Sequence, residues 1–564
     1  MSEGILQALS PWSEVDTSDY RGLSPRLDDL NGKTIGMFGD FMIVATYMLK
    51  TVEKELRKRY PDAKFSYIQH TTETVEIVKD EKFLPEFNEW VKGVDCILCF
   101  YGSVPSSSLY LGYNAAYMEK LGKPTVMLVV PRTYPAALRG CKAKGVPALR
   151  ILQYDAPVDK INAHVDQEMV DKAVAKDIEK LTEDIVSALT RPLSEEEINP
   201  VIPEQEHARR VFTGTAREIS RQFYKYGWTT GAPIEIPTRE AVDEMLRGTD
   251  LPPEHVVGYI PPKMGCATVE KIAINAVMAG CLPTYMPILI AAVKGALAPN
   301  IILEGWTCSQ STWGPVLTIS GPVVKDINLN VRDNFLSPYY KPNATIARAL
   351  GYIMMNIGGL RPGIEDLSEM GHENRLGLCI GDNSEDSPWK PLHTDFGYDE
   401  EDSAVTLFWP QEHRAISCAS PEAFLSWLCK INPYGWDPGA AIIFSPLAAK
   451  MMADAGWTKQ RILDYIVEYA RRPASEVDLK WLVGNNHLPK TVDLPVDMSH
   501  STRIFWSSEH MFIIVGGGKA GPMVTVLGGG GDHGGPSCTG IELPRNWKSL
   551  VEEYRDIMPE YISY

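Results

Sequence analysis

The side chains best suited to covalent or acid–base chemistry in this 564-residue sequence cluster near its carboxyl end. Asp532, His533 and Cys538 follow a glycine run and bring an acid, a base and a thiol into one short segment. A thiol becomes a nucleophile when a neighbouring base removes its proton. We therefore predict catalytic roles for these three residues, with His533 and a carboxylate in acid–base work.

Two further thiols are predicted as alternative nucleophiles. Cys266 precedes a helix expected from about Thr268 to Ala279, where the helix dipole and free N–H groups lower the pKa of a thiol. Cys308 lies beside Gln310 and Ser311, which are suitable oxyanion donors. For every cysteine the alternative interpretation is a small buried hydrophobic residue.

Several polar and glycine residues are predicted to contact a substrate. Glu304 belongs to a polar segment that either lines a pocket or satisfies its own backbone. Arg348, inside a helix expected over Thr345–Asn356 with Asn343 as its N-cap, should pair with a carboxylate of the protein or of a substrate. Gly529 and Gly530 end a strand and allow close backbone approach.

Metal and phosphate motifs are absent from the sequence. It contains no CxxC, HExxH or HxH pattern, which disfavours a structural zinc. The Gly-Gly-Gly-Lys segment at 516–519 lacks the spacing of a phosphate-binding P-loop. The loop 381–397 collects acidic residues and His393, and it either lines the site or is a solvated surface loop.

Alternating apolar runs and amphipathic helices over residues 30–190 predict a parallel sheet covered on both faces. The expected fold class is α/β, a doubly wound flavodoxin- or Rossmann-like domain followed by a larger α+β domain. We place the first domain at residues 1–190, a proline-rich and charged linker at 191–210, and the second domain, as one unit or two subdomains, at 211–564. The expected strands cover residues 34–39, 64–69, 95–102, 124–130 and 149–155, and one helix is expected over 163–189.

In such sheets ligands bind beyond the carboxyl ends of the strands. Three loops qualify, namely Gly39–Phe41, Tyr101–Ser108 and Pro131–Tyr134. Ser103, Ser106 and Ser107 precede or begin a helix, so they either hold an anion with the helix N–H groups or merely cap the helix. Arg132 favours an anionic group, and Tyr101 either orients a substrate, acts as an acid or packs at the strand end.

The segment GSVPSSSLYLGYNAAYMEKLGKPTVMLVV (102–130) resembles the UGSC-like (seleno)protein domain. It is similar, more remotely, to the substrate-binding selenoprotein subunits of glycine- and betaine-type reductases. In those families a selenocysteine or cysteine precedes Gly-Ser or Gly-Thr, and a further cysteine follows. Tyr101 and Val104 occupy these positions here. A phenol, with a reference pKa of about 10, lacks the redox chemistry of a selenol, so that chemistry does not carry over.

The resemblance covers roughly residues 30–155 and implies chemistry at a C–S, C–Se or C–N bond of a small polar substrate. We expect a lyase or oxidoreductase with its site between the two domains. One alternative is a non-catalytic or substrate-binding subunit of a multi-protein reductase, working with a Cys- or Sec-bearing partner subunit or as a homo-oligomer. Another is a nucleotide- or flavin-dependent oxidoreductase; the sequence identifies no cofactor.

Composition restricts the remaining function classes. The formal net charge of −17 argues against nucleic acid or an anionic membrane as the main partner. The amino terminus lacks the pattern of a signal peptide, and the most apolar region, about 272–303, is interrupted by three prolines and a lysine. Ten cysteines in such a chain predict reduced thiols in a cytoplasm.

Overall fold

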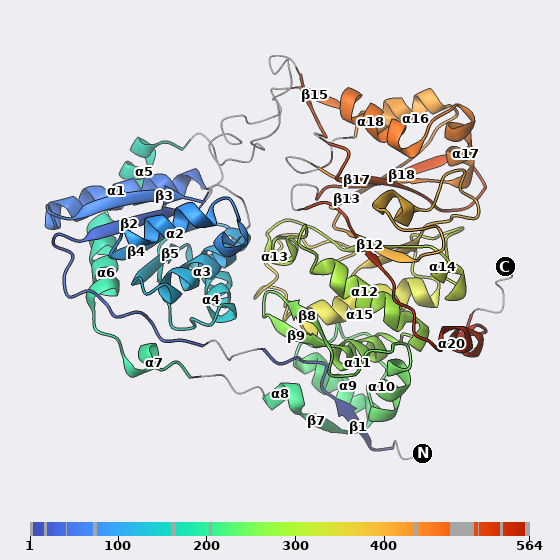
Figure 1. The fold of residues 1–564 in the computed structure, drawn as a ribbon, viewed down its shortest axis with the longest axis horizontal. Helices are drawn as coiled ribbons and strands as arrows, with labels where there is room; N and C mark the ends of the chain where they lie inside the picture. The colour runs from blue at the N-terminus through green and yellow to red at the C-terminus, as the bar shows by residue number, and fades with distance from the viewer. Residues whose placement is uncertain are drawn as a thin grey trace.

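A computed structural model describes residues 4–15, 20–40, 42–70, 76–158, 165–201, 206–431, 433, 438–473, 501–505, 507–530 and 534–558. The chain forms two lobes (Figure 1). The amino-terminal lobe comprises the described residues from 20 to 201. The second lobe comprises residues 4–15 together with the described residues from 206 to 558.

The predicted doubly wound sheet forms the centre of the amino-terminal lobe. Its described strands are all parallel and lie in the order β3-β2-β4-β5-β6. This is the flavodoxin-like order, in which the chain changes direction across the sheet between β2 and β4. The strands are β2 (Thr34–Gly39), β3 (Lys64–Gln69), β4 (Cys96–Gly102), β5 (Thr125–Val129) and β6 (Arg150–Gln153).

Helices cover both faces of this sheet because alternate strand residues point to opposite faces. Helices α1, α5 and α6 pack on Met37, Leu98 and their same-face neighbours, whereas α2, α3 and α4 pack on the face of Cys99 and Met127. The elements are α1 (Ile43–Arg59), η1 (Ile77–Lys79), α2 (Leu84–Lys92), α3 (Pro105–Lys120), η2 (Pro131–Thr133), α4 (Tyr134–Ala143), α5 (Gln167–Val174), α6 (Ile178–Thr190) and α7 (Glu195–Ile198).

The single helix expected over 163–189 is wrong, because α5 ends at Val174 and α6 begins at Ile178. Asp166 caps α5 by accepting the Met169 N–H, which fixes where that helix begins. Within the expected linker, α7 begins with a capping box of Ser194 and Glu197.

The first strand, β1 (Leu6–Leu9), lies on the second lobe, where it pairs antiparallel with β7 (Val211–Gly214) (Figure 1). The following residues continue along that lobe, and Trp12 stacks on Trp228. The chain therefore enters the second lobe, crosses to the amino-terminal lobe and returns.

Two mixed sheets face each other in the second lobe. One has the order β11-β10-β12-β19 and the other β13-β18-β14-β17. Their inner faces meet through apolar side chains that include Val316, Phe408, Ile443 and Phe512. The strands are β10 (Val316–Ser320), β11 (Leu378–Gly381), β12 (Ala404–Phe408), β13 (Glu412–Ser417), β14 (Ala440–Phe444), β17 (Met511–Val515), β18 (Met523–Gly528) and β19 (Ser537–Gly540).

Helices cover the outer faces of both sheets, so the lobe has four layers (Figure 1). Helices α12 (Met286–Ala296) and α15 (Lys341–Asn356) cover the first sheet, and α11 (Val269–Ala279) packs on these two helices. Helices α16 (Pro421–Leu428), α17 (Pro446–Asp454) and α18 (Lys459–Tyr469) cover the second.

Shorter elements connect these layers: α8 (Glu206–Arg209), α9 (Ala216–Lys225), α10 (Arg239–Leu246), β8 (Val256–Ile260), β9 (Gly265–Thr268), η3 (Pro283–Tyr285), α13 (Leu303–Cys308), α14 (Val323–Asp326), η4 (Leu392–Phe396), β15 (Arg471–Pro473), β16 (Ser501–Arg503) and α20 (Trp547–Tyr554).

The expected N-cap of α15 is wrong. The helix begins at Lys341, and the Asn343 amide inside it bonds the backbone of Asn330 and Cys379.

Candidate functional site

The carboxyl ends of β2 and β4 adjoin at the point where the strand order reverses. Asp40 directly follows β2, and Tyr101 and Gly102 end β4. The Asp40 N–H donates to the Phe100 carbonyl at 3.0 Å, which holds the two strand ends together. This is where an open α/β sheet binds its ligand.

Asp40 has a buried carboxyl group at this edge of the sheet, and its pKa is strongly shifted. The Met42 N–H donates to its Oδ1 at 3.1 Å, while its buried Oδ2 has no hydrogen-bond partner among the described residues. Burial raises the pKa of the Asp40 carboxyl well above its ordinary value, against the opposing effect of the Met42 and Tyr101 N–H groups. A buried carboxyl with one unused oxygen is suited to hold a proton and donate it.

Tyr101, in contrast, has a fully buried side chain whose hydroxyl is bonded to backbone. It donates to the Tyr154 carbonyl at 2.9 Å and accepts the Ala156 N–H at 3.1 Å. Burial raises its pKa far above the ordinary value for tyrosine. Tyr101 thus joins the end of β4 to the segment after β6.

The predicted serines lie at the junction of β4 and α3. The Ser107 and Ser108 hydroxyls donate back to the Val104 carbonyl at 3.1 and 2.9 Å, and Val104, the N-cap residue of α3, makes no side-chain cap bond to the first N–H groups of the helix. Ser106 is buried in the first turn. Ser103 is fully buried, and its Oγ has no hydrogen-bond partner among the described residues. Its hydroxyl and the uncapped helix start provide donors for a polar ligand.

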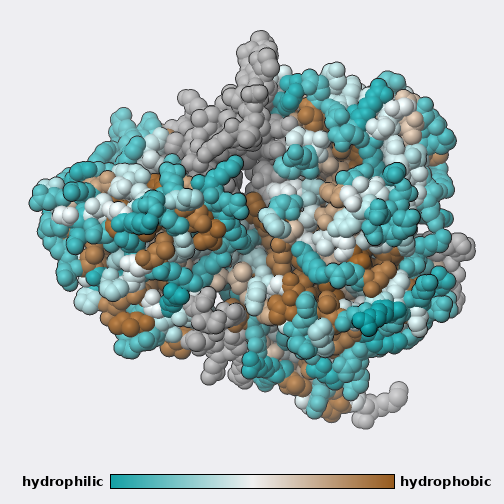
Figure 2. Space-filling view, viewed as in Figure 1, coloured by the Kyte–Doolittle hydropathy of each residue, from teal (hydrophilic) through white to brown (hydrophobic). Residues whose placement is uncertain are grey.

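Helix α3 continues from this junction into the contact between the lobes. Its side chains Leu109, Tyr110 and Tyr113 form a buried cluster with Cys308 of α13. The Tyr110 hydroxyl donates to Glu304 Oε2 at 3.2 Å, again from one lobe to the other. Figure 2 shows the furrow between the two lobes on one face of the molecule. The structure therefore brings the predicted residues Glu304 and Cys308 against the helix that begins at the serine loop.

The three predicted thiols occupy different environments. Burial raises the pKa of Cys308 to about 12 and that of Cys538 to about 11, so both hold their protons at neutral pH. The Cys308 thiol lies at the end of the buried helix α13, beside apolar side chains and 3.6 Å from the Thr307 hydroxyl. Cys266 is half-buried in β9, and its N–H donates to the Glu14 carbonyl at 2.8 Å. All ten cysteines are free.

The glycine run at the end of β18 packs against Trp306 of α13. A side chain at Gly530, which has a φ of +78°, would lie 2.6 Å from the Trp306 ring, so this position requires glycine. Gly529 also has a positive φ, +114°. Asp532 and His533, predicted as the acid and base, lie outside the described residues.

The two predicted arginines bond to protein groups. Arg132, on η2, lies 3.8 Å from Glu369 of the second lobe, and both side chains are more than half exposed. Arg348 bonds the Tyr352 hydroxyl and the Pro233 carbonyl, each at 2.7 Å, and pairs with no carboxylate of the described residues. Arg348 thus stabilises α15 and the loop beside it.

His393 is fully buried, and the solvated-loop interpretation is wrong for it. Its Nδ1 lies 3.1 Å from Ser320 Oγ, between the two sheets. No three His, Cys, Asp or Glu side chains in the described ranges lie together as a metal site requires.

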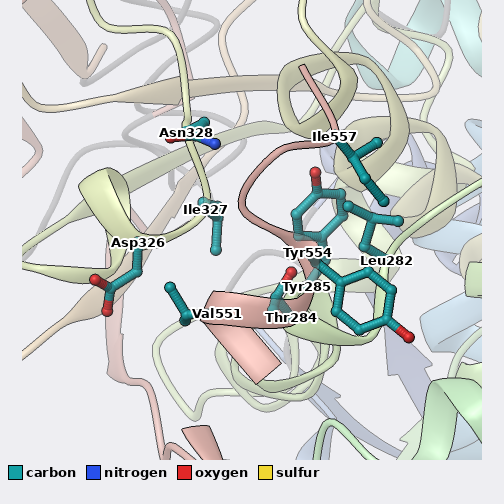
Figure 3. A pocket seen from close by; sticks show the side chains of 9 residues that line it. All are labelled: Leu282, Thr284, Tyr285, Asp326, Ile327, Asn328, Val551, Tyr554 and Ile557. Carbon is teal, nitrogen blue, oxygen red and sulfur yellow. The ribbon is translucent and has the colours of Figure 1, made fainter. Parts of the chain in front are cut away.

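A separate surface pocket lies where α20 meets η3 and α14 (Figure 3). Its polar lining includes Thr284, Asp326, Asn328 and Tyr554. None of the predicted site residues contributes to it, and it lies on the edge of the second lobe away from the amino-terminal lobe (Figure 1).

The sequence signals missed Asp40 as an acid, although its loop was among the three selected. An aspartate directly after a buried strand, in the first strand–helix turn of the sheet, is the pattern that points to it. Sequence also missed Tyr110 and Tyr113, which look like ordinary core residues of a helix until the second lobe is placed against them.

None of the helices in the described part of the chain combines the length and the apolar character that crossing a membrane requires. No curated protein matches this sequence. The UGSC family does match, over residues 7–184, a range that contains the parallel sheet and its strand-end site. The amino-terminal part of this chain is therefore a UGSC-like domain.

Proposed function

We propose that the protein is an enzyme that binds a small polar substrate at the carboxyl edge of the UGSC-like sheet and cleaves a carbon–heteroatom bond, C–S, C–Se or C–N. The observation that carries this proposal is Asp40, a buried carboxyl at the switch point with an unused oxygen and a raised pKa. The substrate class is taken from the resemblance of residues 102–130 to the substrate-binding subunits of reductases.

Asp40 acts in this proposal as a general acid. A base, the role predicted for His533, removes a proton from the carbon next to the one that bears the heteroatom, and the electron pair of that C–H bond forms the C=C bond of the product. The C–heteroatom bond breaks as the heteroatom takes its electron pair and the proton of Asp40, so the leaving group departs neutral. The Ser103 hydroxyl and the uncapped N–H groups of α3 bind the polar end of the substrate. A carboxyl kept neutral by burial can perform this role near pH 7.

The test uses the full chain and a panel of amino-acid-derived thioethers, selenoethers and amines, with released thiol, selenol and ammonia as readouts. Wild-type protein should turn over at least one member. Asp40→Asn should lower that turnover about 100-fold or more, the usual contribution of a general acid.

The matched control is Asp95→Asn, at the opposite end of the same sheet, where Oδ2 accepts the Thr34 N–H at 2.7 Å. This variant should keep its turnover. The proposal fails if wild-type protein releases no product from the panel, or if Asp40→Asn retains full turnover.

A second candidate function is a substrate-binding subunit of a multi-protein reductase in a cytoplasm. The position of Tyr101 favours it, because the residue at the family's selenocysteine position has its hydroxyl bonded to backbone. In this case, turnover of the panel would require addition of a Cys- or Sec-bearing homologue.

A further inference from the structure

A group of cationic side chains gathers where α4 meets two turns of the second lobe. Arg139 comes from α4 of the UGSC-like domain. Lys263 lies in the turn between β8 and β9, and Arg361 lies in the turn after α15. This cationic cluster, Arg139, Lys263 and Arg361, contains none of the residues predicted from sequence.

Shared contacts hold the cluster together. Glu365 binds both arginines. Arg361 donates through Nε to Glu365 Oε2 at 3.0 Å and through Nη2 to Oε1 at 2.7 Å, and Arg139 Nη2 also contacts Oε1. The Trp12 ring links the other pair, with Lys263 Nζ 3.6 Å and the Arg361 guanidinium 5.9 Å from its centroid. Both lobes therefore contribute to one cluster.

The cationic cluster contains more positive side chains than paired carboxylates among the described residues. Glu365 is the one carboxylate among the described residues that pairs with these three cations, and its side chain is only 2% exposed. Lys142, one turn along α4, adds a further cation close to Arg139. Among the described residues, one carboxylate thus pairs with two permanently charged guanidiniums, which leaves one positive charge without a paired carboxylate.

Burial and the neighbouring cations change the pKa of Lys263. Burial, followed by the charges of Arg139, Lys271 and Arg361, lowers the pKa of its ammonium to about 6. Its Nζ donates to the Ser13 carbonyl, not to a carboxylate. The amine is therefore mostly neutral at pH 7, and an added negative charge would favour its protonation.

We infer that Arg139, Arg361 and Lys263 form a binding site for a small organic anion, one that bears a carboxylate or a phosphate group, between the two lobes. Guanidinium groups donate paired, charge-assisted hydrogen bonds to the oxygens of a carboxylate or of a phosphate. Arg139 and Arg361 are 26% and 34% exposed, so the anion can reach them from solvent. The net charge of −17 disfavours a polyanion and favours a small ligand.

This site differs from the strand-end site, because it is built by α4 and the second lobe and includes neither Asp40 nor Ser103. A bound anion would contact Arg139 of one lobe and Arg361 of the other, and so would strengthen the contact between the lobes. The inference does not depend on the proposed reaction.

Calorimetric titration of the full chain with inorganic phosphate and, separately, with succinate at low ionic strength tests the site. We expect saturable binding of at least one anion, with proton uptake at pH 7 as Lys263 becomes charged. Heats measured in buffers of different ionisation enthalpy report that uptake. Binding of only one anion identifies which group the site accepts.

Arg139→Gln and Arg361→Gln should each weaken anion binding at least tenfold. If one of the two variants does not fold, the other still tests the site. Glu365→Gln should strengthen binding, because it removes the competing carboxylate. The control is Arg57→Gln, an exposed arginine on α1 of the same lobe that pairs with Glu53 at 2.6 Å; this variant should bind as wild type does. Absence of binding of both anions to wild-type protein, or unchanged binding by both arginine variants, overturns the inference.

Discussion

Burial disfavours the charged forms of two residues that do not belong to the ordinary core. Asp40 has its pKa raised by burial, and Lys263 has its pKa lowered by burial and by neighbouring cations. Such arrangements cost stability and are concentrated at functional sites. Tyr101 and Cys308 are also buried, but their surroundings keep them in the uncharged form that they already hold near pH 7.

Asp40→Asn should therefore stabilise the protein at neutral pH. The folded-state pKa of Asp40 lies above its unfolded value of about 4, so wild-type protein loses stability as the pH rises from about 4 through the folded pKa. The amide has no such penalty, and the stability gained by substitution should grow with pH over that window. Urea unfolding of both proteins at several pH values measures the difference, and a difference independent of pH would contradict the assignment.

Among the elements, helices α3 and α4 cross unusually closely because each carries a glycine at the contact. A side chain at Gly112 would lie 2.5 Å from the Ala137 carbonyl oxygen, and one at Gly140 would lie 2.3 Å from that of Leu109. The crossing fixes α4, and with it Arg139, the residue before Gly140. Close packing of these helices thus positions one side of the cationic cluster.

Gly140→Ala should destabilise the protein by about 1 to 3 kcal/mol, the usual cost of overpacking a rigid contact. The carbonyl that obstructs the new methyl group is backbone and cannot rotate away. Gly93→Ala is the control, because the nearest atom there is 3.5 Å away and its φ of −84° suits alanine. Thermal unfolding compares the two variants, and equal melting temperatures would show that the crossing tolerates a methyl group.

The sequence predicted the elements whose signal is local. All five expected strands of the UGSC-like sheet are confirmed, because buried parallel strands are short apolar runs between turn residues. The strand expected before Gly529 and Gly530 is also found, as β18, which pairs antiparallel with β13 and β14. Asn343 was misassigned as an N-cap because its amide bonds the backbone of residues distant in sequence.

The candidate site was less predictable, because its members meet only through tertiary structure. Tyr110 and Glu304 are 194 positions apart, and Arg139 and Glu365 are 226 apart. No periodicity within either segment indicates such pairs. The serine loop was found because a strand, a turn and a helix start follow one another in the chain.

At the scale of the whole molecule, the second lobe completes the UGSC-like domain. Helix α3 is buried over most of its circumference, whereas a helix on an isolated sheet exposes one face. One side of α3 packs on the sheet and α4, and its tyrosines pack on α13. The strand-end loop is therefore connected to the second lobe through a single rigid helix.

A double-mutant cycle tests whether this connection contributes to the stability of the whole chain. Tyr110→Phe removes the donor of the 3.2 Å bond between the lobes, and Glu304→Gln replaces its charged acceptor with a neutral one, so the cycle should give a coupling energy of about 0.5 to 3 kcal/mol. The control is Tyr117→Phe on the same helix, whose hydroxyl bonds Asn88 within the lobe at 3.0 Å; it should show no coupling with Glu304→Gln. Free energies of unfolding in urea supply all the terms. If Tyr110 and Glu304 substitutions are additive, the buried contact between the lobes does not couple them, and α3 is held by its own lobe alone.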